Sequence, residues 1–108
     1  MKYSIIVPVY NRPDEIGELL ESLCSQTETD FEVIVVEDGS QIPCKDVCEK
    51  FASILDLHYY NKENSGPGMS RNYGAERSAG DYIIVLDSDV VLPDGYIAAI
   101  NRELNQHP

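Results

Sequence analysis

Short apolar runs alternate with amphipathic segments along this 108-residue sequence. Residues 3–10 are almost continuously β-branched or aromatic, a pattern typical of a strand that is buried on both faces. Residues 31–36 and 82–86 repeat this pattern, and residues 57–60 form a shorter run of the same kind. Parallel strands are buried on both faces and need long crossover connections. The alternation therefore predicts an α/β fold with a mostly parallel sheet.

Helices are expected in the segments between and after these strands. The first follows Asn11, which can cap it, and the second covers residues 47–55. The third covers residues 69–78 and can end at Gly80 in a left-handed cap, and the fourth opens at Pro93. Since crossovers between parallel strands are right-handed, these elements predict a Rossmann-like sheet flanked by helices, in the strand order 3-2-1-4.

Polar residues follow most of the predicted strands. In a doubly wound sheet, ligands bind outside the carboxyl ends of the strands, where the strand order reverses. The sequence thus predicts a ligand site at one edge of the sheet. The polar segments that reach this edge are Tyr10-Asn11-Arg12 after the first strand, Glu37-Asp38-Gly39-Ser40 after the second, and Asp87-Ser88-Asp89 after the fourth.

Asp87 and Asp89 lie where the chain leaves the fourth predicted strand. A tight turn there can aim both carboxylates at one point, which is unfavourable without a cation because like charges repel. A divalent ion of the Mg²⁺ or Mn²⁺ type, bound by one or two carboxylates and by phosphate oxygens, fits this arrangement. The alternative is that either aspartate only caps a turn before the last helix.

Other side chains of this edge have both a binding and a structural interpretation. Asp38 can accept hydrogen bonds from a sugar hydroxyl or a base N–H, or it can form an Asx turn with Gly39. Tyr10 can stack on a planar base, or it can pack at the rim. Arg71 can pair with phosphate or a base carbonyl, or it can be a solvated ion-pair partner. Each signal is weak alone, so the interpretation depends on their combination.

In order and spacing, these segments resemble the family 2 glycosyltransferases, and the resemblance covers nearly the whole chain. It implies the GT-A fold and identifies residues 1–108 as the N-terminal, nucleotide-sugar-binding part of a glycosyltransferase domain. The motifs that carry it are Pro8-Val9-Tyr10-Asn11-Arg12, Glu37-Asp38-Gly39-Ser40, Gly66-x-x-x-x-Arg71-Asn72 and Asp87-Ser88-Asp89.

The resemblance also implies residue roles. Tyr10 would stack on the base, Asp38 would recognise it, commonly as uracil, and Arg71 would contact the base or the diphosphate. Asp87 is expected at the ribose and Asp89 at Mn²⁺ or Mg²⁺. Glu37 differs from the aspartate often found at its position. The implied nucleotide-binding residues are Pro8, Tyr10, Asn11, Arg12, Glu37, Asp38, Gly39, Gly66, Arg71, Asn72, Asp87 and Ser88, with Asp89 and Asp87 at the metal.

The reaction that the resemblance implies is metal-dependent sugar transfer with inversion, most often from a UDP-sugar. The hydroxyl of a saccharide or lipid-linked acceptor attacks the anomeric carbon, and the nucleoside diphosphate leaves from the opposite face. The metal acts as a Lewis acid on the departing phosphates. Family members continue into an acceptor-binding half that carries the general base, which nothing in this sequence matches. We therefore expect a truncated, donor-binding half that is inactive alone.

The composition limits the partners and the location. A formal net charge of −11 disfavours nucleic acid as a partner and requires local cations at any diphosphate site. The sequence has no apolar run long enough to cross a bilayer and no signal peptide. We expect a cytoplasmic location, peripheral to the inner face of the membrane in the full-length protein.

The sequence is also compatible with two other functions and contains a second group of potential metal ligands. The segment Leu86-Asp87-Ser88-Asp89-Val90-Val91 resembles the nucleophile motif of haloacid-dehalogenase-type phosphatases, but that motif belongs after the first strand. A nucleotide-binding module without catalysis, or a partner subunit of a glycosyltransferase assembly, is the other alternative. The cysteines are expected to be structural thiols, because neither His58 nor His107 is placed to complete a zinc site with Cys44 and Cys48.

Overall fold

The protein, described by a computed structural model over residues 1–106, is built on one four-stranded sheet with the order β3-β2-β1-β4. All neighbouring strands are parallel, so the predicted strand order is confirmed. β2 and β3 each extend two residues beyond their predicted ends, because their pairing continues through Asp38 and Lys62. The strands are β1 (Tyr3–Val9), β2 (Phe31–Asp38), β3 (Leu57–Lys62) and β4 (Tyr82–Val85).

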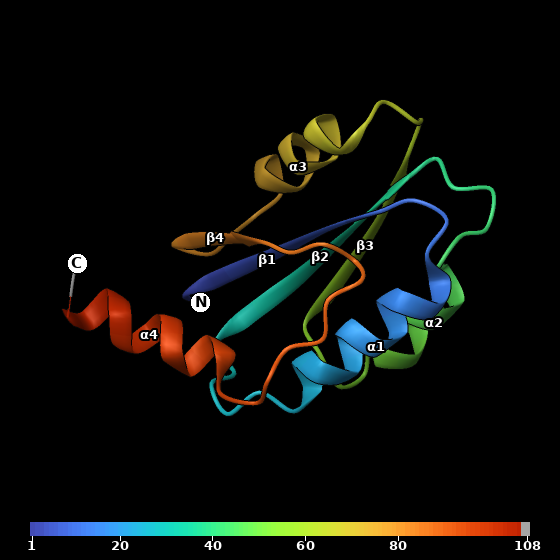
Figure 1. Cartoon of the computed structure of the whole chain (residues 1–108). Coiled ribbons are helices and arrows are strands. Elements are labelled where there is room, and N and C mark those ends of the chain that lie inside the picture. Colours follow the sequence, from blue (N-terminus) through green and yellow to red (C-terminus); the bar gives the residue numbers. More distant parts are fainter. Residues whose placement is uncertain (107–108) are drawn as a thin grey trace.

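Helices cover both faces of the sheet, with α3 on one side and α1, α2 and α4 on the other (Figure 1). None of the helices in residues 1–106 is long and apolar enough to cross a membrane. The fourth helix begins three residues later than Pro93, since Asp94 is tied to Thr27 by a backbone hydrogen bond of 3.0 Å. The helices are α1 (Pro13–Cys24), α2 (Lys45–Phe51), α3 (Pro67–Glu76) and α4 (Tyr96–Gln106).

The alternation of side chains along β1 and β2 divides the interior into two layers. Odd-numbered residues join the main core with α1 and α4, whereas even-numbered residues face α3. Helix α3 lies close to the sheet at Gly74, where an added Cβ would come within 2.7 Å of Ile6 Cγ2. The core residues of the odd-numbered face are Tyr3, Ile5, Val7, Val9, Phe31, Val33 and Val35.

The predicted cap at Asn11 is wrong. Arg12 occupies the N-cap position of α1 and makes no side-chain hydrogen bond there. Asn11 instead has a left-handed backbone with φ of 54°, which turns its side chain toward the loop after β2. Its Oδ1 accepts hydrogen bonds from the backbone N–H groups of Gln41 at 2.8 Å and Ile42 at 3.0 Å. Asn11 therefore joins two loops at the carboxyl edge of the sheet.

The predicted left-handed cap at Gly80 is also wrong. Helix α3 ends at Glu76, with Arg77 as its C-cap, and Gly80 does not have a positive φ. A glycine is nevertheless required there, because the chain passes directly over β1. A Cβ at Gly80 would lie 2.7 Å from the backbone nitrogen of Ser4 and 2.7 Å from the carbonyl carbon of Tyr3.

We expect Gly80→Ala to lower the free energy of unfolding by about 2 to 3 kcal/mol, because backbone atoms of a buried strand must move to admit the methyl group. Urea denaturation of the wild type and the variant measures this change. Gly95→Ala is the matched control, since nothing lies within 4 Å of its Cβ position, and it should change stability by less than about 0.5 kcal/mol. Equal effects of the two substitutions would contradict the close approach at Gly80.

Candidate functional site

Two adjoining hollows open at the carboxyl ends of β1, β2 and β4. The first pocket has a volume of about 270 Å³ and the second about 230 Å³, and Pro8 and Pro67 line both. The other residues that line the first pocket are Val9, Tyr10, Asp38, Asn64, Gly66 and Ser70. Those of the second pocket are Arg12, Arg71, Val85, Asp87, Ser88 and Asp89.

Asp38 lies at the end of β2 in the first pocket, and its side chain is only 6% exposed. Its Oδ1 accepts hydrogen bonds from Lys62 Nζ at 2.6 Å and from the Ser65 N–H at 2.9 Å. Its Oδ2 accepts the Gly66 N–H at 3.0 Å. The carboxylate thus fixes the loop that leads into α3, and the Asx turn with Gly39 does not form.

The surroundings of Asp38 keep it ionised. Burial alone would raise the pKa of this carboxyl group. The hydrogen bonds from Lys62, Ser65 and Gly66, together with the charge of Lys62, outweigh burial and hold the pKa below its ordinary value of 3.8. The first pocket therefore contains a carboxylate that can accept further hydrogen bonds but cannot donate one.

This pKa predicts how stability depends on acid. Because the folded-state pKa lies below the unfolded value, the carboxylate stabilises the fold above about pH 4, and this contribution is lost as the pH falls through the folded-state pKa. We expect the free energy of unfolding to decline more steeply below about pH 4 in the wild type than in Asp38→Asn, as measured by urea denaturation. Parallel pH profiles would contradict the low pKa.

The second pocket brings together charges of opposite sign. Asp87 and Asp89 follow β4 and are exposed, and Arg12 and Arg71 line the same pocket from the start of α1 and from α3. Two carboxylates are a suitable donor set for Mn²⁺ or Mg²⁺, which complete their coordination with waters and phosphate oxygens. The arginines supply the local positive charge that a phosphorylated ligand needs on a chain of net charge −11.

Glu37 lies outside both pockets because it points to the opposite face of the sheet from Asp38. It is fully buried, and its Oε1 accepts hydrogen bonds from the Cys44 N–H at 2.7 Å and the Tyr59 hydroxyl at 2.9 Å. Its Oε2 accepts the Ser40 hydroxyl. Ser40 Oγ in turn accepts the Asn11 N–H at 2.9 Å. These contacts hold the loops after β1 and β2 in fixed positions.

The remaining residues expected at the site have different surroundings. Gly66, with φ of 96°, lines the first pocket, whereas Gly39 and Asn72 line neither pocket. Gly39 has φ of 65°, and a Cβ there would lie 2.6 Å from the backbone nitrogen of Asn64. Lys62 and Asn64 could not be predicted from the sequence, because a polar residue near a strand end gives no sign of its partner on the neighbouring strand.

A doubly wound parallel sheet with a crevice at its switch point, and with carboxylates at the end of β2 and after β4, defines a ligand-binding α/β domain. Comparison with known proteins assigns the domain to a family. The sequence profile of Glycosyl transferase family 2 matches residues 4–108, and the chain belongs to this family.

Relatives and solved structures support this assignment. An uncharacterized glycosyltransferase of Haemophilus influenzae is 46% identical over 105 residues, which cover 97% of this chain and 35% of that protein. The structure of Staphylococcus aureus TarS 1-349 in complex with UDP-GlcNAc matches with a TM-score of 0.93 and 35% identity, covering 99% of this chain and 32% of that one. The GT-A fold expected from the resemblance is therefore confirmed.

A more distant structure contains a metal. The mannosyltransferase PcManGT from Pyrobaculum calidifontis, in complex with GDP-Man and Mn²⁺, matches with a TM-score of 0.79 and 26% identity, covering 85% of this chain and 28% of that one. This chain spans 35% of the length of the H. influenzae relative and 13% of that of an uncharacterized glycosyltransferase of Rickettsia bellii. In this chain the Asp87-Ser88-Asp89 segment follows the fourth strand, whereas the nucleophile motif of the phosphatase alternative belongs after the first.

Proposed function

We propose that this chain is the donor-binding part of a glycosyltransferase that uses a UDP-sugar. The observation that carries the proposal is the pair of adjoining pockets that share Pro8 and Pro67. One has apolar walls and an ionised carboxylate, and the other has two carboxylates and two arginines. This division matches a nucleobase in the first pocket and a ribose with its diphosphate in the second. The S. aureus TarS structures with UDP-GlcNAc and with UDP support the choice of uridine.

In the first pocket, the nucleobase would lie against Tyr10, whose side chain is 49% exposed and free to stack. Asp38 would accept an N–H of the base. Because its carboxylate remains ionised, it favours a base edge that donates a hydrogen bond, as uracil N3–H does, over one that only accepts.

In the second pocket, Arg12 and Arg71 would pair with the diphosphate, Asp87 with the ribose, and Asp89 with Mn²⁺ or Mg²⁺. When bound, such a cation would neutralise charge that develops on the leaving diphosphate. Pro8 and Ser88 would complete the walls around the nucleotide. Asn11, Glu37 and Gly39 would act indirectly by fixing the loops, and Asn72, exposed on α3, would act at the rim of the site.

The proposed reaction inverts the anomeric centre. An acceptor hydroxyl attacks the anomeric carbon, the bond to the diphosphate oxygen breaks, and a general base takes the hydroxyl proton. We assign no residue of this chain as that base and place it in the part of the protein that binds the acceptor. The chain alone is then expected to bind the donor without transferring the sugar, and clear turnover by this chain with any acceptor would contradict this assignment.

The melting temperature with UDP, GDP or ADP, each with and without Mn²⁺, tests the proposal. At one hundred times its Kd, a ligand adds about 2.7 kcal/mol, which corresponds to a rise of roughly 10 °C or more for a domain of this size. We expect the rise to be selective for UDP, dependent on Mn²⁺ and lost in Asp89→Ala. Asp81→Ala, which removes an exposed aspartate outside both pockets, should leave it unchanged. A rise that persists in Asp89→Ala would contradict the metal assignment.

A further inference from the structure

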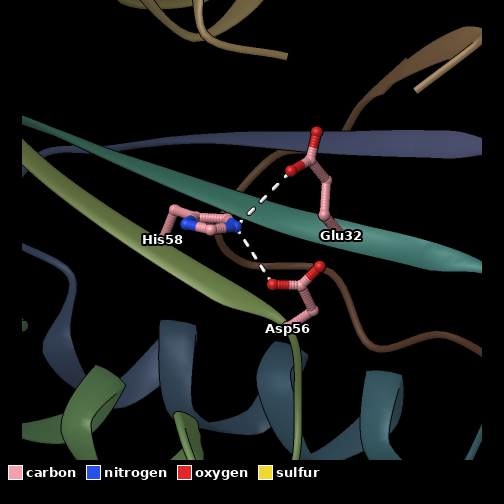
Figure 2. A group of neighbouring side chains, drawn as sticks. All are labelled: Glu32, Asp56 and His58. Carbon is pink, nitrogen blue, oxygen red and sulfur yellow. Dashed lines mark ion pairs between the residues drawn. The ribbon is translucent and has the colours of Figure 1, made fainter. Parts of the chain in front are cut away.

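A second group of side chains of the types that bind metals lies at the opposite edge of the sheet from the pockets. Glu32 is the second residue of β2, and Asp56 and His58 lie on either side of the first residue of β3. Figure 2 shows the two carboxylates converging on one imidazole nitrogen. His58 Nε2 is 3.0 Å from Asp56 Oδ1 and 3.5 Å from Glu32 Oε1. This group is named the Glu32–Asp56–His58 cluster.

The carboxylate of Glu32 is buried, and one of its oxygens points into the cluster. Its side chain is 5% exposed. Oε2 is fixed by hydrogen bonds from the Ser4 hydroxyl at 2.6 Å and the Ala79 N–H at 2.7 Å. In residues 1–106, the only group paired with Oε1 is His58 Nε2, at the long distance of 3.5 Å. Such orientation of a ligand by outer hydrogen bonds is typical of metal sites, and it leaves Oε1 available for a further, stronger interaction.

The distances within the cluster suit a small cation. In a tetrahedral zinc site, ligands about 2.1 Å from the metal are about 3.4 Å from one another. The separations of 3.0 and 3.5 Å from His58 Nε2 bracket this value, and all three ligand atoms lie within 4.8 Å of one another. Asp56 is 49% exposed, so its side chain can adjust, and His58 is 45% exposed, so the cluster is open to solvent.

We propose that Glu32 Oε1, Asp56 Oδ1 and His58 Nε2 bind a divalent transition-metal ion of the zinc type, with water as a fourth ligand. Two carboxylates and a neutral imidazole carry a charge of −2, which the ion neutralises. The imidazole favours Zn²⁺ over Mg²⁺, because Mg²⁺ prefers oxygen ligands in octahedral geometry. The bound ion would join β2 to β3 and, through Ser4 and Ala79, to β1 and the chain before β4.

The cysteines are the main competing ligands for Zn²⁺. Cys44 Sγ and Cys48 Sγ are 3.8 Å apart and both residues are buried. The contact with Cys48 and burial raise the pKa of the Cys44 thiol above its usual range, so the thiolate that a metal requires is disfavoured. The double variant Cys44→Ser/Cys48→Ser removes both of these thiols. Zn²⁺ binding that persists in it cannot come from Cys44 and Cys48.

Calorimetric titration of the metal-free chain with Zn²⁺ tests the proposal, without any nucleotide. We expect one equivalent to bind and to raise the melting temperature. His58→Ala and Asp56→Asn should each weaken binding at least tenfold, since even changes to outer hydrogen-bonding partners cost about 10- to 100-fold. His107→Ala, which removes the other histidine and lies outside the described residues, should bind Zn²⁺ as the wild type does. The same is expected of Asp81→Ala, which removes an exposed aspartate outside both pockets, and of the double serine variant.

Three results would overturn the proposal. One is the absence of Zn²⁺ binding to the wild type, and another is unchanged affinity in both His58→Ala and Asp56→Asn. The third is loss of Zn²⁺ binding in the double serine variant, which would show that the cysteines bind the metal. A sulfur-to-metal charge-transfer band in the Co²⁺-loaded wild type would show the same cysteine ligation. Cooperative unfolding of each metal-free variant shows that it is folded. Because His58 and Asp56 are half-exposed, neither substitution removes a core contact.

Discussion

Lys62→Met is expected to lower the free energy of unfolding by about 3 kcal/mol, because it leaves Asp38 as a buried carboxylate without its cation. The Lys62 side chain is 11% exposed and that of Asp38 is 6% exposed, so water cannot readily replace the lost partner. The two backbone N–H groups that remain on Asp38 place the effect at the lower end for broken buried ion pairs. Urea denaturation at neutral pH measures the loss.

The same substitution should weaken binding of UDP, because Lys62 holds the carboxylate proposed to recognise the base. Lys45→Met is the control, since Lys45 is exposed. The free energy of unfolding of this variant should remain within about 0.5 kcal/mol of that of the wild type. In Asp38→Asn/Lys62→Met the buried charge is absent, so the double variant should be more stable than the two single effects added together predict. Strict additivity would show that the ion pair does not contribute as described.

Glu37→Leu is expected to cost about 3 kcal/mol or more, although leucine is apolar and the site is fully buried. The substitution leaves three donors without their acceptor, namely the Cys44 N–H, the Tyr59 hydroxyl and the Ser40 hydroxyl. The Cys44 residue is buried, so water cannot replace the acceptor of its N–H group. The loss of this hydrogen bond therefore makes the largest contribution to the destabilisation. Chemical denaturation of the variant tests this.

Glu37→Gln is the graded comparison for this prediction. Its amide oxygen can still accept from Cys44 and Tyr59, and only the contact with Ser40 must be rearranged. We expect Glu37→Gln to lower the free energy of unfolding by less than half as much as Glu37→Leu does. If leucine is tolerated as well as glutamine, Glu37 does not anchor the loops.

The two buried carboxylates on the α3 face of β2 hold both ends of that helix. Asp38 accepts the N–H groups of Ser65 and Gly66 before α3, and Glu32 accepts the N–H of Ala79 after it. The position of α3 in turn places Arg71 beside the second pocket. The proposed donor site and the proposed zinc site therefore lie at opposite ends of the same helix.

Much of this arrangement follows from the sequence alone. The apolar runs at residues 3–10 and 31–36 favour strands buried on both faces of a parallel sheet, and with right-handed crossovers they favour the strand order 3-2-1-4 that the structure has. The carboxyl ends of parallel strands meet at one edge. For this reason Tyr10, Asp38 and Asp87 could be predicted to lie together without knowledge of any contact.

Only the tertiary structure decides which side chains act together. Glu37 and Asp38 are adjacent acids in the sequence, but the alternation of a strand sends them to opposite faces, one to a loop anchor and the other to a pocket. Lys62 reaches Asp38, and His58 reaches Glu32, only because β3 pairs beside β2 in this register. Such pairings depend on contacts between residues more than 20 positions apart, which local sequence patterns do not encode.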